Sequence, residues 1–436
     1  MTVRLNIQSL SHGGAAVARL EDGRVVFVTG ACPGDVVEAE ITAEHARHAE
    51  ARVVEVVEPS SDRVEPPCPY FGECGGCQWQ HVAYERQLAE KRQIVVESLQ
   101  RIGGLDASAL VRETVRSPEQ YGYRNKVELL AHTGPRGLDL GYARASTHDI
   151  INIDSCLLLP RRLSKAPRAI RGALRYLAGE QDLGITRVAL RAAHNTRDVE
   201  IGVWTTPGPF PRALAETTLA GALKATSVVR VIVKDRAGER SVSNVEVLRG
   251  KGAWKERLGG RTMLASAPSF FQVNTAVAEQ LVTIALDGLD PSPADRVVDM
   301  YAGVGTFTLP IAERSDDVVA VESSRFALGD LRRNLEGAQL YADVVGGDAA
   351  RELAGLGRFD RALVDPPRAG LSGQALESLA ETGASRIVYV SCDPATLARD
   401  AKRLTTHGYA IRTATPVDLF PQTYHVETVA VFERVR

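Results

Sequence analysis

From about residue 265 to the end of the chain, short β-branched segments alternate with stretches of helical periodicity. The strand candidates are 296–301, 317–322, 342–346, 361–365, 386–391 and 425–432. Parallel strands need a crossover connection, usually a helix, so this alternation predicts a doubly wound, Rossmann-like α/β domain. In such a sheet, ligands bind beyond the carboxyl ends of the strands. The residues that follow each strand are therefore the first candidates for function.

The chain has 436 residues, which is too long for one compact core, and its charge changes along its length. Residues 1–60 read as short strands between turns and predict a small β-barrel of the oligonucleotide-binding type. Residues 61–262 predict a mixed α+β central domain, and residues 263–436 form the predicted α/β domain. The net charge is −5 over residues 1–62 and +9 over residues 145–262. The central segment is thus the predicted contact with a phosphate backbone.

Part of this positive charge repeats at helical spacing. The basic residues of the repeat are Arg161, Arg162, Lys165, Arg168, Arg171 and Arg175. On a helix they would line one side, which suits RNA phosphates but is equally typical of an ordinary solvated face. No apolar run is long enough for a membrane span, and the first ten residues lack a signal-type stretch. We expect a cytoplasmic monomer with no membrane partner.

The first strand of the α/β domain is followed by a glycine-rich turn. Gly303 and Gly305 lie in this turn, and the second strand ends at Glu322, about twenty residues later. Glycines let a ligand approach the backbone, and a carboxylate at this distance can bind ribose hydroxyls. A dinucleotide fingerprint needs a further glycine or alanine where Thr308 stands. The turn therefore favours a nucleoside without pyrophosphate, such as S-adenosylmethionine.

Two later strand ends carry side chains suited to covalent chemistry. Cys392 follows strand 386–391 and precedes Pro394, which suits the first turn of a helix. A helix N-terminus lowers a thiol pKa, so Cys392 is a candidate nucleophile, although a cysteine at a strand end is more often a small buried apolar residue. Glu427 interrupts the last apolar strand, where a charge needs a partner unless it faces outward from an edge strand.

The fourth strand ends at Asp365, where two prolines stiffen the chain. In methyltransferases that act on exocyclic amines, the corresponding motif closes with an aromatic residue that stacks on the base. Arg368 stands at that position here, so methylation of an exocyclic amine is disfavoured.

Three of the six cysteines, Cys68, Cys74 and Cys77, lie within ten residues of one another. Six cysteines are too few for a disulfide scaffold in a chain of this length, and the three clustered ones lie too close together for ordinary core packing. Cys156 is the leading candidate for a fourth ligand. Three clustered cysteines with a distant fourth resemble a 4Fe-4S site, whereas paired C-x2-C spacings would favour zinc, which stays as the alternative.

Taken in order, the strand-end motifs resemble those of a known family, the S-adenosylmethionine-dependent RNA uracil-5 methyltransferases. The motifs are Phe271-Gln272-Val273-Asn274, Asp299-Met300-Tyr301-Ala302-Gly303-Val304-Gly305, Asp365-Pro366-Pro367-Arg368-Ala369-Gly370, Ser391-Cys392-Asp393-Pro394 and His425-Val426-Glu427-Thr428. The resemblance implies that Cys392 is the nucleophile and Glu427 the base. It also implies a set of residues that bind the cofactor: Gln272, Tyr301, Thr306, Glu322, Asp348 and Asp365. Phe270 or Phe271 is a candidate to stack near a uracil turned out of its own stack.

The cysteine pattern and residues 1–58 resemble the branch of this family that carries a 4Fe-4S cluster and a TRAM barrel. The resemblance implies four cluster ligands: Cys68, Cys74, Cys77 and Cys156. Members of this branch mostly methylate 23S ribosomal RNA, while relatives methylate the T-loop uridine of tRNA, so the expected partner is RNA, with rRNA favoured. Two hypotheses from other classes stay open. One is a noncatalytic RNA-binding or ribosome-assembly protein, and the other is an iron-sulfur redox enzyme that uses a nicotinamide cofactor.

Overall fold

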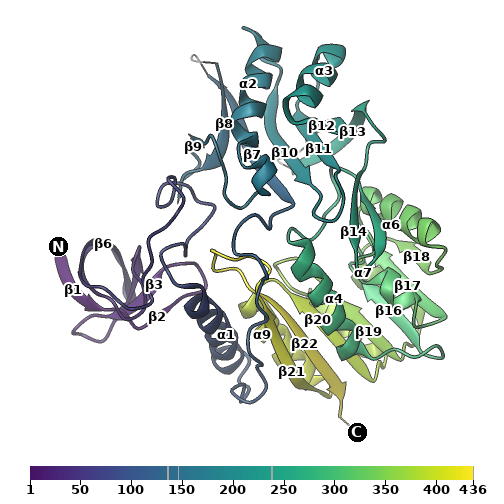
Figure 1. The fold of residues 1–436 in the computed structure, drawn as a ribbon. Helices are drawn as coiled ribbons and strands as arrows, with labels where there is room; N and C mark the ends of the chain where they lie inside the picture. Colours follow the sequence, from purple (N-terminus) through teal and green to yellow (C-terminus); the bar gives the residue numbers. More distant parts are fainter. Residues whose placement is uncertain (135–136, 146, 237–238, 436) are drawn as a thin grey trace.

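The computed structural model describes residues 1–134, 137–145, 147–236 and 239–435. Three large sheets and one two-stranded ribbon follow one another along these residues (Figure 1). No helix among them combines the length and the apolar character that crossing a bilayer requires.

The N-terminal sheet has six strands in the order β1-β5-β6-β4-β3-β2. The strands are β1 (Thr2–Asn6), β2 (Ser9–Leu10), β3 (Ala16–Arg19), β4 (Val25–Thr29), β5 (Val36–Glu44) and β6 (His48–Glu58). Alternate side chains of β4 and β5, such as Val26, Val28 and Val37, are fully buried, which is the period-2 pattern expected of a half-buried strand. The sequence indicated β4 to β6 but not the three strands before them.

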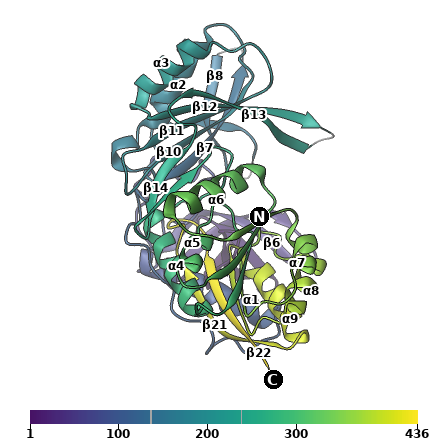
Figure 2. The same ribbon diagram turned by 90° about the vertical axis from the view of Figure 1, so that its right-hand side faces the viewer.

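The central sheet has seven strands in the order β13-β12-β11-β10-β7-β8-β9, with α2 and α3 packed on it. Its strands are β7 (Lys126–Gly134), β8 (Gly137–Ala143), β9 (Ile150–Asn152), β10 (Ile185–Ala192), β11 (Val199–Thr205), β12 (Ser227–Arg236) and β13 (Glu239–Arg249). Its helices are a short 3-10 turn (Arg161–Leu163), α2 (Ala166–Ala178) and α3 (Arg212–Leu223). The β12–β13 ribbon projects from the body of the molecule (Figure 2).

The predicted basic stripe is divided between the 3-10 turn and α2 and is partly engaged within the protein. Arg162, Arg171 and Arg175 donate to the carbonyl oxygens of Ala193, Ile153 and Leu138. These three guanidinium groups therefore hold the central domain together, and they are less available to RNA phosphates than the spacing predicted.

The C-terminal sheet has the strand order β18-β17-β16-β19-β20-β22-β21, and a ribbon of β14 and β15 precedes it. The strands are β14 (Trp254–Leu258), β15 (Arg261–Ala265), β16 (Arg296–Met300), β17 (Asp317–Glu322), β18 (Asp343–Gly346), β19 (Arg361–Val364), β20 (Arg386–Ser391), β21 (Tyr409–Val417) and β22 (Glu427–Arg434). The strands from β16 to β20 are parallel, whereas β22 is antiparallel to both of its neighbours. The alternation predicted from the sequence is present, but β21 was missed, because Arg412 and Pro416 interrupt its apolar pattern.

Helices cover both faces of this sheet (Figure 2). One face carries α4 (Thr275–Leu289), α5 (Thr308–Ala312) and α6 (Arg325–Ala338), and the other carries α7 (Ala349–Leu356), α8 (Gly373–Glu381) and α9 (Pro394–Thr406). Helix α1 (Tyr84–Arg101), from the segment assigned to the central domain, also packs on this second face, where Val95 and Leu99 are fully buried. The domain boundary expected after residue 262 falls within β15.

Candidate active site

A cleft of about 480 Å³ opens at the edge of the C-terminal sheet where the parallel strands end. Seven of the predicted site residues line it: Gln272, Tyr301, Thr306, Glu322, Asp365, Cys392 and Glu427. Tyr301, Asp365 and Cys392 directly follow β16, β19 and β20. Glu427 reaches the same edge for a different reason, because β22 runs antiparallel and begins there. The reversed direction of one strand thus brings a residue from the end of the chain to the others.

The turn after β16 depends on backbone conformations that few residues adopt. Tyr301 has a φ of 65°, which is uncommon for a residue other than glycine and often marks a functional site. At Gly305, where φ is 94°, a Cβ atom would lie 2.5 Å from Leu309 Cδ1 and 2.7 Å from Leu331 Cδ1. Only glycine fits this position, and the resulting turn exposes backbone at the floor of the cleft.

Two polar side chains beside this turn fit a nucleoside cofactor. The carboxylate of Glu322 accepts hydrogen bonds from the backbone N–H groups of Gly303 (2.8 Å) and Ser324 (2.6 Å), which hold it at the cleft. Gln272 is 4% exposed, and its Oε1 atom is buried with no hydrogen-bond partner among the described residues. A fixed carboxylate suits ribose hydroxyls, and an unpartnered amide oxygen suits a donor such as an amino group. S-adenosylmethionine has both ribose hydroxyls and amino groups.

Cys392 and Glu427, the predicted nucleophile and base, lie at the same end of two neighbouring strands. Ser391 of β20 pairs with Thr428 of β22, so Cys392 and Glu427 extend from adjacent positions of the ladder. Burial, with the nearby carboxyl groups of Glu427 and Asp365, raises the pKa of the Cys392 thiol to about 12. The expectation that the helix N-terminus would lower this pKa was wrong, because burial outweighs it.

A further physical reason lies in the N-cap of α9. The side chain of Asp393 accepts hydrogen bonds from the N–H groups of Ala395 (3.0 Å) and Thr396 (2.9 Å). The amides that would stabilise a thiolate are therefore already paired with a carboxylate. Among the neighbouring charges, Arg368 is the one that lowers the pKa of Cys392.

Two of the three carboxyl groups that line the cleft, those of Asp365 and Glu427, are desolvated. Burial raises the pKa of Glu427 to about 7, against the opposing effect of Arg368. Burial and the proximity of Glu427 raise the pKa of Asp365 well above its usual range. The raised pKa of Asp365 favours its protonated form, and near pH 7 Glu427 is close to half ionised, so a proton can be taken up or given at this end of the cleft.

An exposed aromatic ring stands at the mouth of the cleft. Phe270 lines the cleft and is 62% exposed, whereas Phe271 is buried against Trp254 with ring centroids 5.2 Å apart. The structure thus distinguishes the two phenylalanines, which the sequence left equivalent. Phe270 can stack on a base, and Phe271 belongs to the core.

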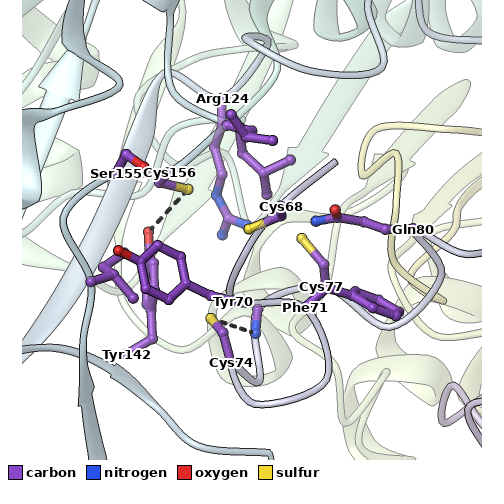
Figure 3. Close-up of a pocket in the computed structure, with 14 residues that line it drawn as sticks. Cys68, Tyr70, Phe71, Cys74, Cys77, Gln80, Arg124, Tyr142, Ser155 and Cys156 are labelled. Atoms are coloured by element: carbon purple, nitrogen blue, oxygen red, sulfur yellow. Dashed lines mark hydrogen bonds between the residues drawn. The ribbon is translucent and has the colours of Figure 1, made fainter. Parts of the chain in front are cut away.

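All four predicted metal ligands line a second pocket, which contains no other cysteine (Figure 3). Cys156 reaches Cys68, Cys74 and Cys77 from a distant segment, and its Sγ accepts a hydrogen bond from the Tyr142 hydroxyl at 3.8 Å. The Sγ of Cys74 accepts one from the N–H of Gly76 at 3.4 Å. The sixth cysteine, Cys32, is fully buried in the N-terminal sheet, as predicted from its lack of partners.

The Sγ atoms of these four thiols can be compared with the spacing of zinc ligands. With Zn–S bonds of about 2.3 Å, the sulfur atoms of a tetrahedral zinc site lie about 3.8 Å apart. No three of the four Sγ atoms lie within 4.8 Å of one another. Within the described part of the chain, three ligand atoms come that close at His45, His48 and Glu50, on the surface hairpin between β5 and β6. The cysteine set is thus more widely spaced than a zinc tetrahedron.

Comparison with known proteins places the chain in a family. Family models match residues 1–54 (TRAM domain), 267–340 (ribosomal RNA adenine dimethylase) and 355–435 (tRNA (uracil-5-)-methyltransferase). The chain is 37% identical to a 23S rRNA (uracil(1939)-C(5))-methyltransferase of Alkalilimnicola ehrlichii, over 98% of this chain and 96% of that one. It is also 37% identical to an uncharacterized RNA methyltransferase of Thermosynechococcus vestitus, over 99% and 97% of the two chains. The chain belongs to the RNA uracil-C5 methyltransferase family.

A solved structure agrees with this assignment. The fold of this uracil-C5 methyltransferase is similar to that of the tRNA (uracil-54, C5)-methyltransferase of Pyrococcus abyssi in complex with S-adenosyl-L-homocysteine. The TM-score is 0.76 and the identity 28%, over 99% of this chain and 100% of that one. The protein is therefore an S-adenosylmethionine-dependent enzyme, and neither the noncatalytic nor the nicotinamide hypothesis is supported. Its N-terminal sheet is a TRAM domain.

The methyltransferase cleft also contains residues that the motifs did not indicate. Arg124, just before β7, lines both the cleft and the cysteine pocket, and Phe420 enters from the loop between β21 and β22. No local pattern marks either residue, because each reaches the cleft only through the packing of separate domains. Asp348 does not line the cleft but is exposed at the N-cap of α7, close enough to Tyr301 for its charge to add to burial in raising the pKa of that phenol, and its role in cofactor binding stays a prediction.

Proposed function

We propose that this enzyme methylates C5 of a uridine in 23S ribosomal RNA through a covalent adduct between Cys392 and C6 of the uracil. The observation that carries the proposal is the placement of Cys392 and Glu427 at adjacent ladder positions in the cofactor cleft. The full-length likeness to named 23S rRNA enzymes supports an rRNA substrate. The likeness to a tRNA (uracil-54, C5)-methyltransferase makes the T-loop uridine of tRNA the second candidate.

The adduct is needed because C5 of uracil is a poor nucleophile. Once ionised, the sulfur of Cys392 adds to C6, and the electrons of the C5–C6 double bond move toward O4 to give an enolate whose C5 is nucleophilic. The positive charge of Arg368 favours ionisation of the thiol. In the protonated form, which its raised pKa favours, the carboxyl of Asp365 can donate a hydrogen bond to a uracil carbonyl oxygen and so hold the base and stabilise the enolate.

S-adenosylmethionine, held by Gln272, Tyr301, Thr306, Glu322 and Asp365, would supply the methyl group that C5 accepts. C5 then carries both a methyl group and a proton. The carboxylate of Glu427 removes that proton, the C5–C6 double bond re-forms and the C6–S bond breaks, which frees Cys392. A buried carboxyl whose pKa is about 7 suits this role, because the best general base has a pKa near the working pH.

The target uridine must leave its stack before the sulfur can reach C6. Phe270 stands at the cleft mouth with an exposed ring and can stack on a base beside the flipped uridine. The residues of this mechanism meet in one cleft of a single chain, so the proposed reaction needs no second copy, and the proposed enzyme is a monomer. The free thiols support a reducing compartment such as the cytoplasm.

Mapping of 5-methyluridine tests the choice of RNA. Cells that lack the protein should lose one 5-methyluridine from the large-subunit rRNA, and the wild-type gene should restore it. A Cys392→Ala gene should not restore it. Loss of the modification from the tRNA T-loop alone would transfer the assignment to tRNA, and retention of every 5-methyluridine would contradict the proposal.

The four pocket cysteines are further proposed to hold a 4Fe-4S cluster. Their supply of four thiols from two segments, and a spacing wider than a zinc tetrahedron, support the larger group. Methyl transfer needs no electron transfer, so the cluster would be structural. It would join residues 68–79, called the cysteine loop here, to the central domain through Cys156.

Protein purified without oxygen should be coloured and contain about four iron and four sulfide ions per chain. Cys156→Ser should lose most of the iron, because one of the four ligands is gone, whereas Cys32→Ser should keep it. A colourless protein that contains zinc and no iron would refute the cluster.

A further inference from the structure

The segment that precedes the catalytic base is held at one unusual residue. This segment, residues 418–426, is called the base loop here; it joins β21 to β22 and ends directly before Glu427. Phe420 and His425 of the base loop line the cleft. Gln422, between them, is 2% exposed and has a φ of 71°. A residue other than glycine keeps such a conformation only where its surroundings impose it, and such residues cluster at functional sites.

Four hydrogen bonds impose this conformation on Gln422. Its carbonyl oxygen accepts from the N–H groups of Gln78 (3.1 Å) and Trp79 (3.0 Å). Its N–H donates to Oε1 of Gln87 (3.0 Å), and its side-chain Oε1 accepts from Nε2 of Gln87 (3.1 Å). The Gln87–Gln422 pair is thus bonded through both backbone and side chain, and it is buried at both ends.

The partners of Gln422 come from two other parts of the chain. Gln78 and Trp79 directly follow Cys77, so the cysteine loop is bonded to the base loop through adjacent amides. Gln87 lies on α1, is fully buried and also donates to the carbonyl oxygens of Trp79 (3.0 Å) and Val82 (2.8 Å). Three segments, the cysteine loop, α1 and the base loop, therefore meet at Gln87 and Gln422.

Other contacts hold the base loop to α1 and to the segment just before β7. Lys91 of α1 is fully buried and donates to Asp418 (2.5 Å) and to the carbonyl oxygen of Phe420 (3.0 Å). The Tyr123 hydroxyl donates to the carbonyl oxygen of Pro421 (3.0 Å). The catalytic thiol is held by other elements than the base loop. Cys392 follows β20 and precedes α9, so its position depends on the sheet and on α9. The base loop can therefore shift without moving the nucleophile.

We propose that Gln87 and Gln422 are positioning residues for proton removal by Glu427, and that they transmit the position of the cysteine loop to the base loop. This inference rests on the proposed covalent mechanism. Loosening the pair should slow release of the methylated adduct and leave its formation and cofactor binding unchanged. Small displacements of a catalytic group can lower a rate by about 10². We expect release to slow by about tenfold to 100-fold.

The test compares Gln422→Ala, Gln422→Gly and Gln87→Leu with the wild-type holoprotein. Glycine accepts a positive φ without strain, and the Gln422→Gly variant keeps the backbone carbonyl bonds. Both Gln422 variants lose the side-chain bond to Gln87, but only Gln422→Ala keeps the strain of a positive φ, so Gln422→Gly should slow release less. Gln93→Leu is the matched control, since Gln93 lies on the same helix and its side chain bonds only to Glu97 at the surface. If Gln87→Leu does not fold, the two Gln422 variants carry the test.

Three measurements separate this role from a merely structural one. Single-turnover assays give the rates of adduct formation and release from denaturing gels, with RNA tritiated at C5 reporting loss of the proton. Hydrogen exchange of residues 418–426 reports the mobility of the base loop, and iron content shows that the cysteine site is intact. Slower release with normal adduct formation and faster exchange in the base loop is the expected result.

Equal slowing of formation and release, or unchanged exchange in the base loop, would overturn the proposal. Failure of the wild-type protein to form any adduct would instead refute the proposed mechanism, and it would remove the basis of the catalytic role. The exchange measurement would still show whether Gln87 and Gln422 hold the base loop.

Discussion

A Cys392→Ala variant is expected to form no covalent adduct with RNA and to lose methylation by a factor on the order of 10⁶, the size of loss seen when a covalent nucleophile is removed from an enzyme. Without the sulfur, nothing adds to C6, and C5 stays too poor a nucleophile to accept the methyl group. Transfer of a radiolabelled methyl group to RNA and denaturing gels measure the two losses.

Cofactor binding should survive this change, because the residues beside the glycine turn lie on β16 and β17 rather than β20. S-adenosylmethionine should therefore raise the melting temperature of Cys392→Ala as it does that of the wild type. Cys32→Ala supplies a matched control, since that thiol is buried in the TRAM domain. Undiminished methylation by Cys392→Ala would contradict the covalent mechanism.

A Glu427→Gln variant is expected to form the adduct but to release it about 10² to 10⁴ times more slowly, the usual contribution of a general base. The amide has nearly the same shape as the carboxyl but cannot accept the C5 proton, so the methylated RNA stays bound to Cys392. Denaturing gels should show RNA-linked protein that accumulates while turnover falls. A Glu427→Gln protein with normal turnover, or with no adduct at all, would argue against this role for Glu427.

The pH dependence of release offers an independent check on the same residue. Because burial raises the pKa of Glu427 to about 7, its carboxylate is depleted below that pH and predominates above it. Release from preformed wild-type adduct should therefore rise with pH through about 7 and then level off. Measuring preformed adduct removes the ionisation of the Cys392 thiol from the profile. The rise should be absent in Glu427→Gln, and its persistence there would assign the titration to another group.

Much of the α/β domain could be predicted because its signals are local. The strands from β16 to β20 are short apolar runs between helical patterns, and the residue that ends each run is visible in the sequence. Glu322 and Asp365 were found in this way, since parallel strands place their carboxyl ends at one edge, whereas Tyr301 was indicated by the family resemblance. Strand β21 was missed because its buried positions are broken by Arg412 and by a register shift after Ile411.

The sequence by itself determined which groups are available: a thiol and a carboxylate in separate motifs, a glycine turn that only glycine can make at Gly305, and four cysteines suited to one centre. The tertiary structure decided how those groups behave. The antiparallel direction of β22 puts Glu427 beside Cys392, burial moves both of their pKa values upward, and the bonds of Gln422 join the cysteine loop to the base loop. These properties depend on desolvation and on contacts between residues far apart in the chain. A local sequence pattern predicts neither the desolvation nor the contacts.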